Sequence, residues 1–273
     1  MAIEPLPHRT ALITGASAGL GEAFAQALAR RGCDLVLVAR REGRLHSLAQ
    51  SLEKAHGIKA LVIAQDLSVP DAGARIIDAL DAAEVAPDIL VNNAGYSIAP
   101  DYLEADWPAQ RDFIMTSVMA VCALTHALVP AMVARRWGRV INLSSIVAFA
   151  PGGSGHTLYP AAKSFTLRFS QSLREEVRGH GVKVTAVCPG STATEFQSVN
   201  MPSSTASSGF WVQSAAAVVE SSLRANAAGR AVHVPGWHNK AIVTALKLLP
   251  DALLLPLIRI GQRALAKQES EPS

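Results

Sequence analysis

The chain has 273 residues, of which 49% are hydrophobic and 17% are charged, and its formal net charge at pH 7 is +3. This length and apolar content suit one large domain that buries a proper core. The small net charge, without a basic run interleaved with aromatic residues, gives no sign of nucleic-acid binding.

The cysteines and histidines argue against two further kinds of chemistry. Cys33, Cys122 and Cys188 are widely separated and form no C-x-x-C pair, so we interpret them as small buried residues in a reducing cytoplasm. The eight histidines show no H-x-x-x-H spacing, and we expect no metal. The segment 1–8 has two prolines and no apolar run, so we expect no secretory signal and a cytoplasmic location.

The chain opens with a strand, a glycine turn and a helix. An apolar run at 10–13 leads into T-G-A-S-A-G-L-G at 14–21, and a helical pattern follows at 22–31. Glycines let the backbone turn tightly and approach a pyrophosphate, and a helix N-terminus offers unpaired N–H groups and the positive end of a dipole. This order predicts a dinucleotide-binding site.

Short apolar runs then alternate with helical patterns. Residues 34–39 and 59–65 are rich in Val, Leu and Ile, as strands covered on both faces should be, and 43–56 carries leucines at helical spacing. Further strands are expected at 89–92, 139–143, 183–188 and 231–234. About seven strands with intervening helices predict an α/β fold with a doubly wound parallel sheet, in a single domain.

The last part of the chain is less ordinary. We assign 1–236 to a dinucleotide-binding catalytic domain, 237–267 to a C-terminal helical extension of the same domain, and 268–273 to a disordered tail. Pro250 and Pro256 interrupt the extension, so neither half can cross a bilayer as an unbroken apolar helix. The extension could cover the substrate pocket, form a subunit interface, or make peripheral membrane contact. We favour the first two.

Two arginines follow the second expected strand. The chain reads V-A-R-R at 38–41, with no carboxylate before Glu42. An acidic residue here would bind the 2′-hydroxyl of a ribose, whereas guanidinium groups suit a 2′-phosphate. We therefore predict that NADP(H) is preferred over NAD(H), with Arg40 as the direct contact and Arg41 as its neighbour. The alternative is a pair of solvated surface arginines.

Tyr159 and Lys163 lie four residues apart and would share one face of a helix. Unperturbed tyrosine titrates near 10, so bringing its pKa toward neutrality means favouring the phenolate by roughly 3 units, or about 4 kcal/mol. A fixed ammonium and a cationic nicotinamide could together supply this. Because Pro160 disfavours helical backbone at the residue before it, we expect Tyr159 to precede the helix and Pro160 to be its first residue.

These motifs together resemble the short-chain dehydrogenase/reductase family, in its short single-domain branch. T-G-x-x-x-G-x-G near the N-terminus and Y-x-x-x-K near the middle are joined, in the family's order, by N-N-A-G at 92–95, V-I-N-L-S-S at 140–145 and P-G-x-x-x-T at 189–194. The resemblance runs from about residue 9 to residue 234. It implies a Rossmann-type fold, NAD(P)-dependent turnover and a homodimer or homotetramer.

The resemblance also implies a mechanism that interconverts a carbonyl and a secondary alcohol. Tyr159 would be the general acid/base, Lys163 would lower its pKa and hold the nicotinamide ribose, and Ser145 would hydrogen-bond the substrate oxygen. Ser117 stands where many relatives place an asparagine that holds a relay water behind the lysine. The backbone carbonyl there could still hold that water, so we expect an altered rate or pH dependence.

Cofactor contacts implied by the resemblance lie in loops after the strands. They are Gly15, Ser17, Gly19, Leu20, Gly21, Arg40, Arg41, Asp66, Leu67, Asn93, Ala94, Gly95, Tyr159, Lys163, Pro189, Gly190, Thr192 and Thr194. Asp66 would accept from the exocyclic amine of adenine; capping the helix expected at 70–80 is its alternative role.

The natural substrate is less clear from the sequence. Residues 195–213 are rich in serine and carry four large apolar side chains, and in relatives this segment is the substrate lid. Those side chains are Phe196, Met201, Phe210 and Trp211. They indicate an apolar carbonyl substrate, or else they dock the segment onto the body.

Two rival functions remain open. A sugar-nucleotide epimerase or dehydratase of the extended branch would use the same Tyr and Lys, but with another glycine spacing and a larger C-terminal domain. An NAD(P)H-binding regulatory protein with little turnover is the second rival, and Ser117 favours it.

Overall fold

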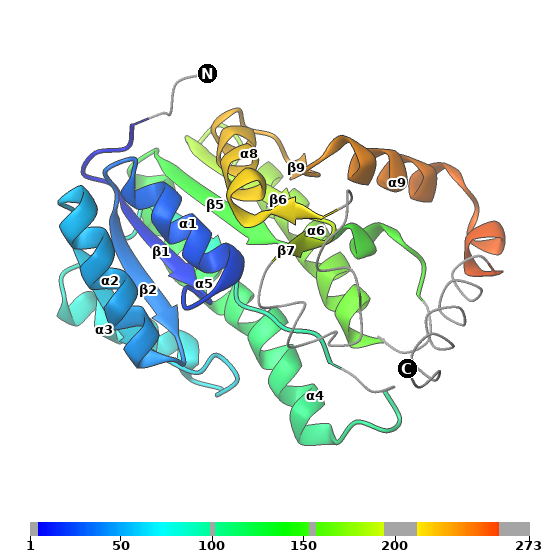
Figure 1. The fold of residues 1–273 in the computed structure, drawn as a ribbon, viewed down its shortest axis with the longest axis horizontal. Helices are drawn as coiled ribbons and strands as arrows, with labels where there is room; N and C mark the ends of the chain where they lie inside the picture. Colours follow the sequence, from blue (N-terminus) through cyan, green and yellow to red (C-terminus); the bar gives the residue numbers. More distant parts are fainter. Residues whose placement is uncertain (1–4, 99–101, 153–156, 194–211, 257–273) are drawn as a thin grey trace, which may run out of the picture.

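Seven strands form one parallel sheet in the order β3-β2-β1-β4-β5-β6-β9 (Figure 1). The computed structural model describes residues 5–98, 102–152, 157–193 and 212–256. The strands are β1 Thr10–Thr14, β2 Asp34–Ala39, β3 Ala60–Ala64, β4 Ile89–Asn92, β5 Gly138–Leu143, β6 Val182–Val187 and β9 Val232–His233. The predicted Rossmann-type doubly wound sheet is confirmed.

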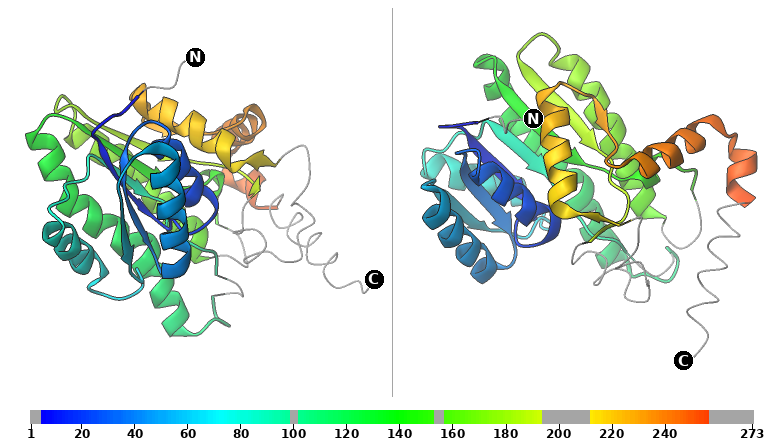
Figure 2. Two further views of the ribbon diagram at one scale, coloured as in Figure 1. Left: turned by 60° about the vertical axis from the view of Figure 1, so that its left-hand side comes forward. Right: turned by 45° about the horizontal axis from the view of Figure 1, so that its top comes forward.

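Helices cover both faces of this sheet (Figure 2). On one face lie α1 Gly19–Ala29, α2 Glu42–His56 and α8 Ala215–Ala227; on the other lie α3 Ala72–Ala82, α5 Ala120–Ala134 and α6 Leu158–Glu176. Successive residues of β1 alternate between the two cores: Ala11 and Ile13 pack with α1 and α2, and Leu12 packs with α3 and α5. Burial on both faces explains the continuous apolar runs of the strands.

A single long helix runs along the second face. It is made of α4 Trp107–Ile114, the π-helix η1 Met115–Met119, and α5. The joined helix Trp107–Ala134 has 28 residues and is long and apolar enough to cross a membrane, by length and composition alone. Phe113, Leu124 and Met132 are fully buried against the rest of the domain, and we therefore interpret it as a core helix.

The structure corrects one predicted boundary near the candidate site. Helix α6 begins at Leu158, so Tyr159 already lies inside the helix and Pro160 is its third residue. The prediction that Tyr159 precedes the helix was wrong. A proline in the first turn loses no helical hydrogen bond, because the N–H groups there have no partner within the helix.

The C-terminal extension is helical as far as the structure describes it. Helix α9 Trp237–Leu248 ends before Pro250, and a second helical turn occupies 251–256. The rest of the extension and the expected tail at 268–273 lie outside the described residues, as do Phe196, Met201, Phe210 and Trp211 of the expected lid. At either end of that lid segment, β7 Thr192–Ala193 pairs with β8 Gln213–Ser214 in a separate two-stranded sheet.

Buried polar side chains join the sheet to the helices behind it. Asn92 Nδ2 donates to Asn142 Oδ1 (2.8 Å) and to Thr125 Oγ1 (3.2 Å), and Asn142 Nδ2 donates to Ser170 Oγ (2.9 Å). All four residues are buried. Since leaving any of these groups unpaired would be costly, the network fixes α5 and α6 on β4 and β5.

The strand order reverses between β1 and β4, which are neighbours although β2 and β3 lie between them in the chain. The glycine turn after β1 and the N-N-A-G segment after β4 therefore meet at the carboxyl edge of the sheet. Ligands of doubly wound folds bind at this switch point.

Candidate active site

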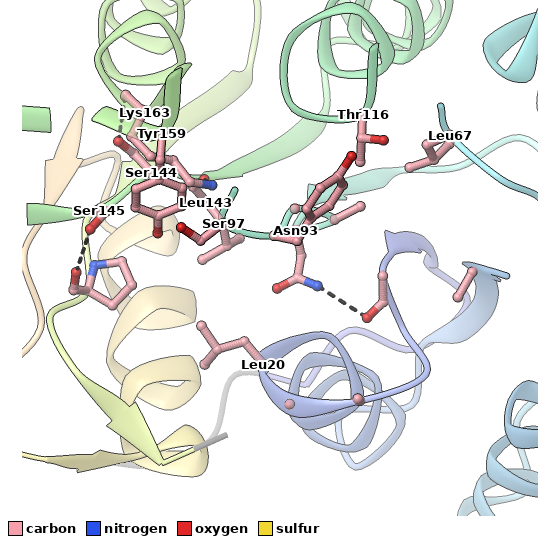
Figure 3. A pocket seen from close by; sticks show the side chains of 18 of the residues that line it. Leu20, Leu67, Asn93, Ser97, Thr116, Leu143, Ser144, Ser145, Tyr159 and Lys163 are labelled. Carbon is pink, nitrogen blue, oxygen red and sulfur yellow. Dashed lines mark hydrogen bonds between the residues drawn. The ribbon is translucent and has the colours of Figure 1, made fainter. Parts of the chain in front are cut away.

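A cavity of about 600 Å³ opens at the switch point, lined by the loops that follow β1 to β6. Its volume is typical of a small-molecule or cofactor site. Ser145, Tyr159 and Lys163 lie at one end of it, and Leu67 and Thr116 lie at the other, with Leu20 between them (Figure 3). We call these the catalytic end and the adenosine end.

The glycine turn leaves the cavity wall bare. Gly15 has a φ of +67°, which favours glycine, and a Cβ on Gly21 would overlap the carbonyl of Gly15. Gly21 thus packs the helix onto the turn and is not among the residues that line the cavity, and its predicted contact with a cofactor stays a prediction. The N-cap of α1 is Ala18, and no described side chain caps this helix. Because its first N–H groups border the cavity, the turn fits a pyrophosphate.

Asn93 ties the two sides of the switch point together. Its Nδ2 donates to the carbonyls of Thr14 (2.9 Å) and Gly15 (3.3 Å). Thr14 Oγ1 in turn accepts from the backbone N–H groups of Asn93 and Ala94, each at 3.0 Å. The glycine turn and the N-N-A-G segment are therefore one rigid wall, which also includes Gly95.

The adenosine end carries the two predicted arginines. Arg41 Nε donates to Ser17 Oγ (3.1 Å) and its Nη2 donates to Ser17 O (3.3 Å), while Arg40 Nη1 lies 3.9 Å from Asp66 Oδ2. Both arginines line the cavity with Asp66 and Leu67. The N-cap of α3 is Asp71, so Asp66 does not cap that helix, and the alternative role considered for it is wrong.

At the catalytic end the two adjacent serines do different things. Ser144 Oγ donates to the backbone carbonyl of Lys163 (2.7 Å), which holds α6 against β5. Ser145 Oγ donates to Pro189 O (3.5 Å) and accepts from Val147 N (3.3 Å), and Ser145 also lies close enough to Tyr159 to lower the pKa of its hydroxyl by hydrogen bonding. The structure therefore brings Ser145, not Ser144, to the tyrosine.

Lys163 is buried beneath the tyrosine. Its Nζ donates to Leu143 O (3.0 Å) and lies 5.6 Å from the centroid of the Tyr159 ring. Burial lowers the pKa of Lys163 to about 8. Burial also raises the pKa of Tyr159 above its usual 10, and the hydrogen bond with Ser145 only opposes that rise.

The expected lowering of the tyrosine pKa, by Lys163 together with a cationic nicotinamide, stays a prediction. The ammonium lies over the ring face rather than at the hydroxyl, and burial of the phenol dominates. At neutral pH this leaves the Tyr159 hydroxyl protonated.

The loop after β6 closes the catalytic end. Pro189 O accepts from Ile146 N (3.0 Å), and Thr192 Oγ1 donates to Gly190 O (3.2 Å). Pro189, Gly190 and Thr192 all line the cavity, and their predicted contact with a cofactor stays a prediction. Thr194 lies outside the described residues.

Ser117 occupies the π-helix η1 and is only 4% exposed. Within the described part of the chain its Oγ has no hydrogen-bond partner, and Thr116, rather than Ser117, lines the cavity. Single π-turns often interrupt helices at functional sites. A catalytic role for Ser117 stays a prediction.

Several lining residues were missed from the sequence. Five of them are Tyr96, Ser97, Thr116, Ile146 and Val147. Four of them directly follow the N-N-A-G segment or Ser145, so their position next to a motif at a strand end could have found them. Thr116 gave no such signal, because it belongs to the helix on the second face.

Comparisons with known proteins agree with this geometry. A family model described as short chain dehydrogenase matches residues 9–203. An uncharacterized oxidoreductase of Myxococcus xanthus is 37% identical over 195 residues, which make up 71% of this chain and 76% of that protein.

Two solved structures are similar over most of the chain. A short-chain dehydrogenase from Sphingobium yanoikuyae in complex with NADPH has 33% identity and a TM-score of 0.77, covering 88% of this chain and 92% of that one. The bulky-bulky ketone specific alcohol dehydrogenase from Comamonas testosteroni has 29% identity and a TM-score of 0.73, covering 90% and 96%.

The fold and site thus define a nucleotide-dependent oxidoreductase that acts on small molecules. The chain belongs to the short-chain dehydrogenase/reductase family and is NAD(P)-dependent.

Replacing Lys163 with Met should stabilise the fold at pH 7. Burial lowers the lysine pKa from 10.5 to about 8, so the buried charge costs at most about 3 kcal/mol. Below pH 8 the lysine is charged in both the folded and the unfolded state, and the full cost is present. Between pH 8 and 10.5 only the unfolded state holds the proton, so the wild type gains stability as pH rises.

Urea unfolding of both proteins at pH 7 and pH 10 measures this difference. We expect the variant's advantage in unfolding free energy to shrink at the higher pH. Lys54→Met, at an exposed position of α2, is the matched control and should show no such change. An advantage of Lys163→Met that is the same at both pH values would contradict the buried charge.

Proposed function

We propose that this protein reduces the carbonyl of an apolar small molecule with NADPH, using Tyr159 as the general acid. The observation that carries the proposal is that Ser145 and Tyr159 lie together at the cavity wall, above a buried lysine (Figure 3). When bound, a nicotinamide would supply the hydride; the proton donor and the groups that position the substrate would come from the chain.

Reduction turns a carbonyl oxygen into an alkoxide that needs a proton in place. The raised pKa of Tyr159 keeps its hydroxyl protonated at neutral pH, which suits a proton donor. Ser145 would donate to the same substrate oxygen and fix its position next to the tyrosine. Both hydroxyls are held before the substrate arrives, so little reorganisation is needed.

Lys163 would hold the ribose hydroxyls of the nicotinamide half and return a proton to Tyr159 after turnover. Its ammonium is fixed by Leu143 O and by the tyrosine ring, which places it between the acid and the interior. Ser117, in the π-helix with an unpartnered Oγ in the described structure, would hold the relay water through its hydroxyl or its backbone carbonyl.

The arginines support a preference for NADPH. Ser17 holds Arg41 across the glycine turn, so this guanidinium is already oriented toward the adenosine end. Arg40 lies beside Asp66, which would take the adenine amine. A 2′-phosphate would accept hydrogen bonds from both arginines. Hydrogen bonds between charged groups are stronger than those between neutral groups. The Sphingobium yanoikuyae structure contains NADPH.

The catalytic end supports an apolar substrate. Leu143, Ile146, Val147 and Pro189 line it around the two hydroxyls. A cytoplasmic location and a homodimer or homotetramer remain predictions from the sequence.

An NAD(P)H-binding regulatory protein with little turnover is the alternative function. Ser117, which stands where many relatives place an asparagine, favours it, because a weakened proton relay would slow the return of the proton to Tyr159. The intact arrangement of Ser145, Tyr159 and Lys163 makes it the second choice.

Tyr159→Phe should lower kcat by about 10²- to 10⁴-fold, because it removes only the proton donor. The Kd for NADPH should stay nearly unchanged. Turnover is measured as the loss of NADPH absorbance in the presence of each member of a panel of ketones, aldehydes, quinones and acyl thioesters. Tyr102→Phe, a surface tyrosine that is 42% exposed, is the control and should behave as the wild type. Equal turnover by Tyr159→Phe and the wild type would refute the assignment.

Arg41→Ala should weaken NADPH binding by about 10- to 100-fold and leave NADH binding nearly unchanged, since only NADPH carries the 2′-phosphate. Fluorescence titration of both nucleotides measures the two Kd values. Arg75→Ala, which removes an exposed arginine paired with Asp71, is the control. If the wild type binds NADH as tightly as NADPH, the proposed preference for NADPH is wrong.

A further inference from the structure

Helix α9 reaches back to the catalytic end through one buried asparagine. The helix starts beyond the β9 edge of the sheet and extends away from the two helical layers (Figures 1 and 2). Asn239, in its first turn, is only 3% exposed. A Cβ built on Gly190 would overlap Asn239 Oδ1 and lie 2.7 Å from its Cγ. The asparagine side chain thus lies directly on the backbone of the loop after β6.

Hydrogen bonds hold this asparagine in place. Its Nδ2 donates to Pro235 O (2.9 Å) and to Gln213 Oε1 (3.2 Å). The backbone N–H of Gln213 donates to Ser191 O (3.1 Å). Asn239 is therefore connected to the loop after β6 twice, directly at Gly190 and through Gln213 at Ser191.

A second contact joins α9 to the other loop of the catalytic end. Lys247 Nζ lies 4.7 Å from the ring centroid of Phe149. Phe149 ends the 3₁₀-helix η2 Ile146–Phe149, whose N-cap is Ser145. The two loops are themselves joined, because Ile146 N donates to Pro189 O. Helix α9 thus rests on both loops that frame the catalytic end.

We propose that Asn239 is a positioning residue. It holds the backbone of the loop 189–192 in the position that lets this loop contact the nicotinamide half of the cofactor. This rests on the proposed function, in which NADPH occupies the cavity. The loop lines the catalytic end, whereas Asn239 contacts the loop at Gly190 and is not among the residues that line the cavity. Asn239 acts through Gly190 and carries out no chemical step.

The contact between Asn239 and Gly190 is closely packed. Gly190 does not have a positive φ, so its lack of a side chain serves the close approach of Asn239 and not a turn. Shortening Asn239 would leave a gap under Gly190 and remove the hydrogen bond to Gln213. Displacement of the loop by a fraction of an ångström would then weaken contacts at the nicotinamide half and spare those at the distant adenosine end.

Asn239→Ala tests this with two ligands. We expect the Kd for NADPH to rise about tenfold. The Kd for 2′-phosphoadenosine 5′-diphosphate should not change, because this ligand has no nicotinamide half and reaches only the adenosine end of the cavity. Both are measured by titration calorimetry. Thr244→Ala, at an exposed position of the same helix, is the matched control and should bind both ligands as the wild type does.

A reciprocal variant approaches the same contact from the loop. Gly190→Ala should weaken NADPH binding because its Cβ displaces Asn239, and the double variant Gly190→Ala with Asn239→Ala should bind NADPH more tightly than Gly190→Ala alone. Such non-additivity is expected only of residues that touch. Asn239→Ser, which keeps a donor, replaces Asn239→Ala in both arms if the alanine variant does not fold.

Each outcome decides between the two proposals. A wild type that binds neither ligand refutes the proposed function. If the wild type binds NADPH, then equal NADPH affinity of the Asn239 variant overturns the positioning role, and so does an equal loss of both ligands, which is what general destabilisation produces. Loss of NADPH affinity alone, with recovery in the double variant, supports it.

Discussion

The buried ammonium of Lys163 is the constraint on which the catalytic end depends. Its pKa is lowered to about 8, so the fold carries this charge at a cost in free energy. The scaffold holds it there from several sides. Ser144 Oγ binds the lysine's own backbone carbonyl, and the hydrogen bond from Asn142 to Ser170 fixes the same helix on β5. Because Lys163 and Tyr159 both lie on α6, conditions that loosen this helix would displace the buried ammonium and the tyrosine hydroxyl together.

The adenosine end is formed mainly by backbone groups. No buried charge is needed there, since the glycine turn and the start of α1 present backbone groups, and Asn93 with Thr14 locks them to the N-N-A-G segment. The arginines there are exposed, and Ser17 binds one of them. One end of the cavity is thus set by backbone geometry at the switch point, and the other by the packing of α6 and the loop after β6, which α9 supports.

Local patterns predicted most of the fold and the motif residues. Strands buried on both faces leave continuous apolar runs, and glycines mark the turn that only they can make, so the sheet and the glycine loop could be found in the sequence. The pKa direction of Tyr159 could not, because burial depends on the whole fold. Thr116 and the contact of Asn239 with Gly190 were equally hidden, since each joins segments far apart in the chain.

The pH profile of single-turnover carbonyl reduction tests the central claim most directly. If a protonated Tyr159 over a charged Lys163 is the donor, the reduction rate should be flat across neutral pH and fall in the alkaline range as these groups lose their protons, while the reverse oxidation should rise there. A reduction rate that increases from neutral to alkaline pH would contradict the assignment of Tyr159 as the acid.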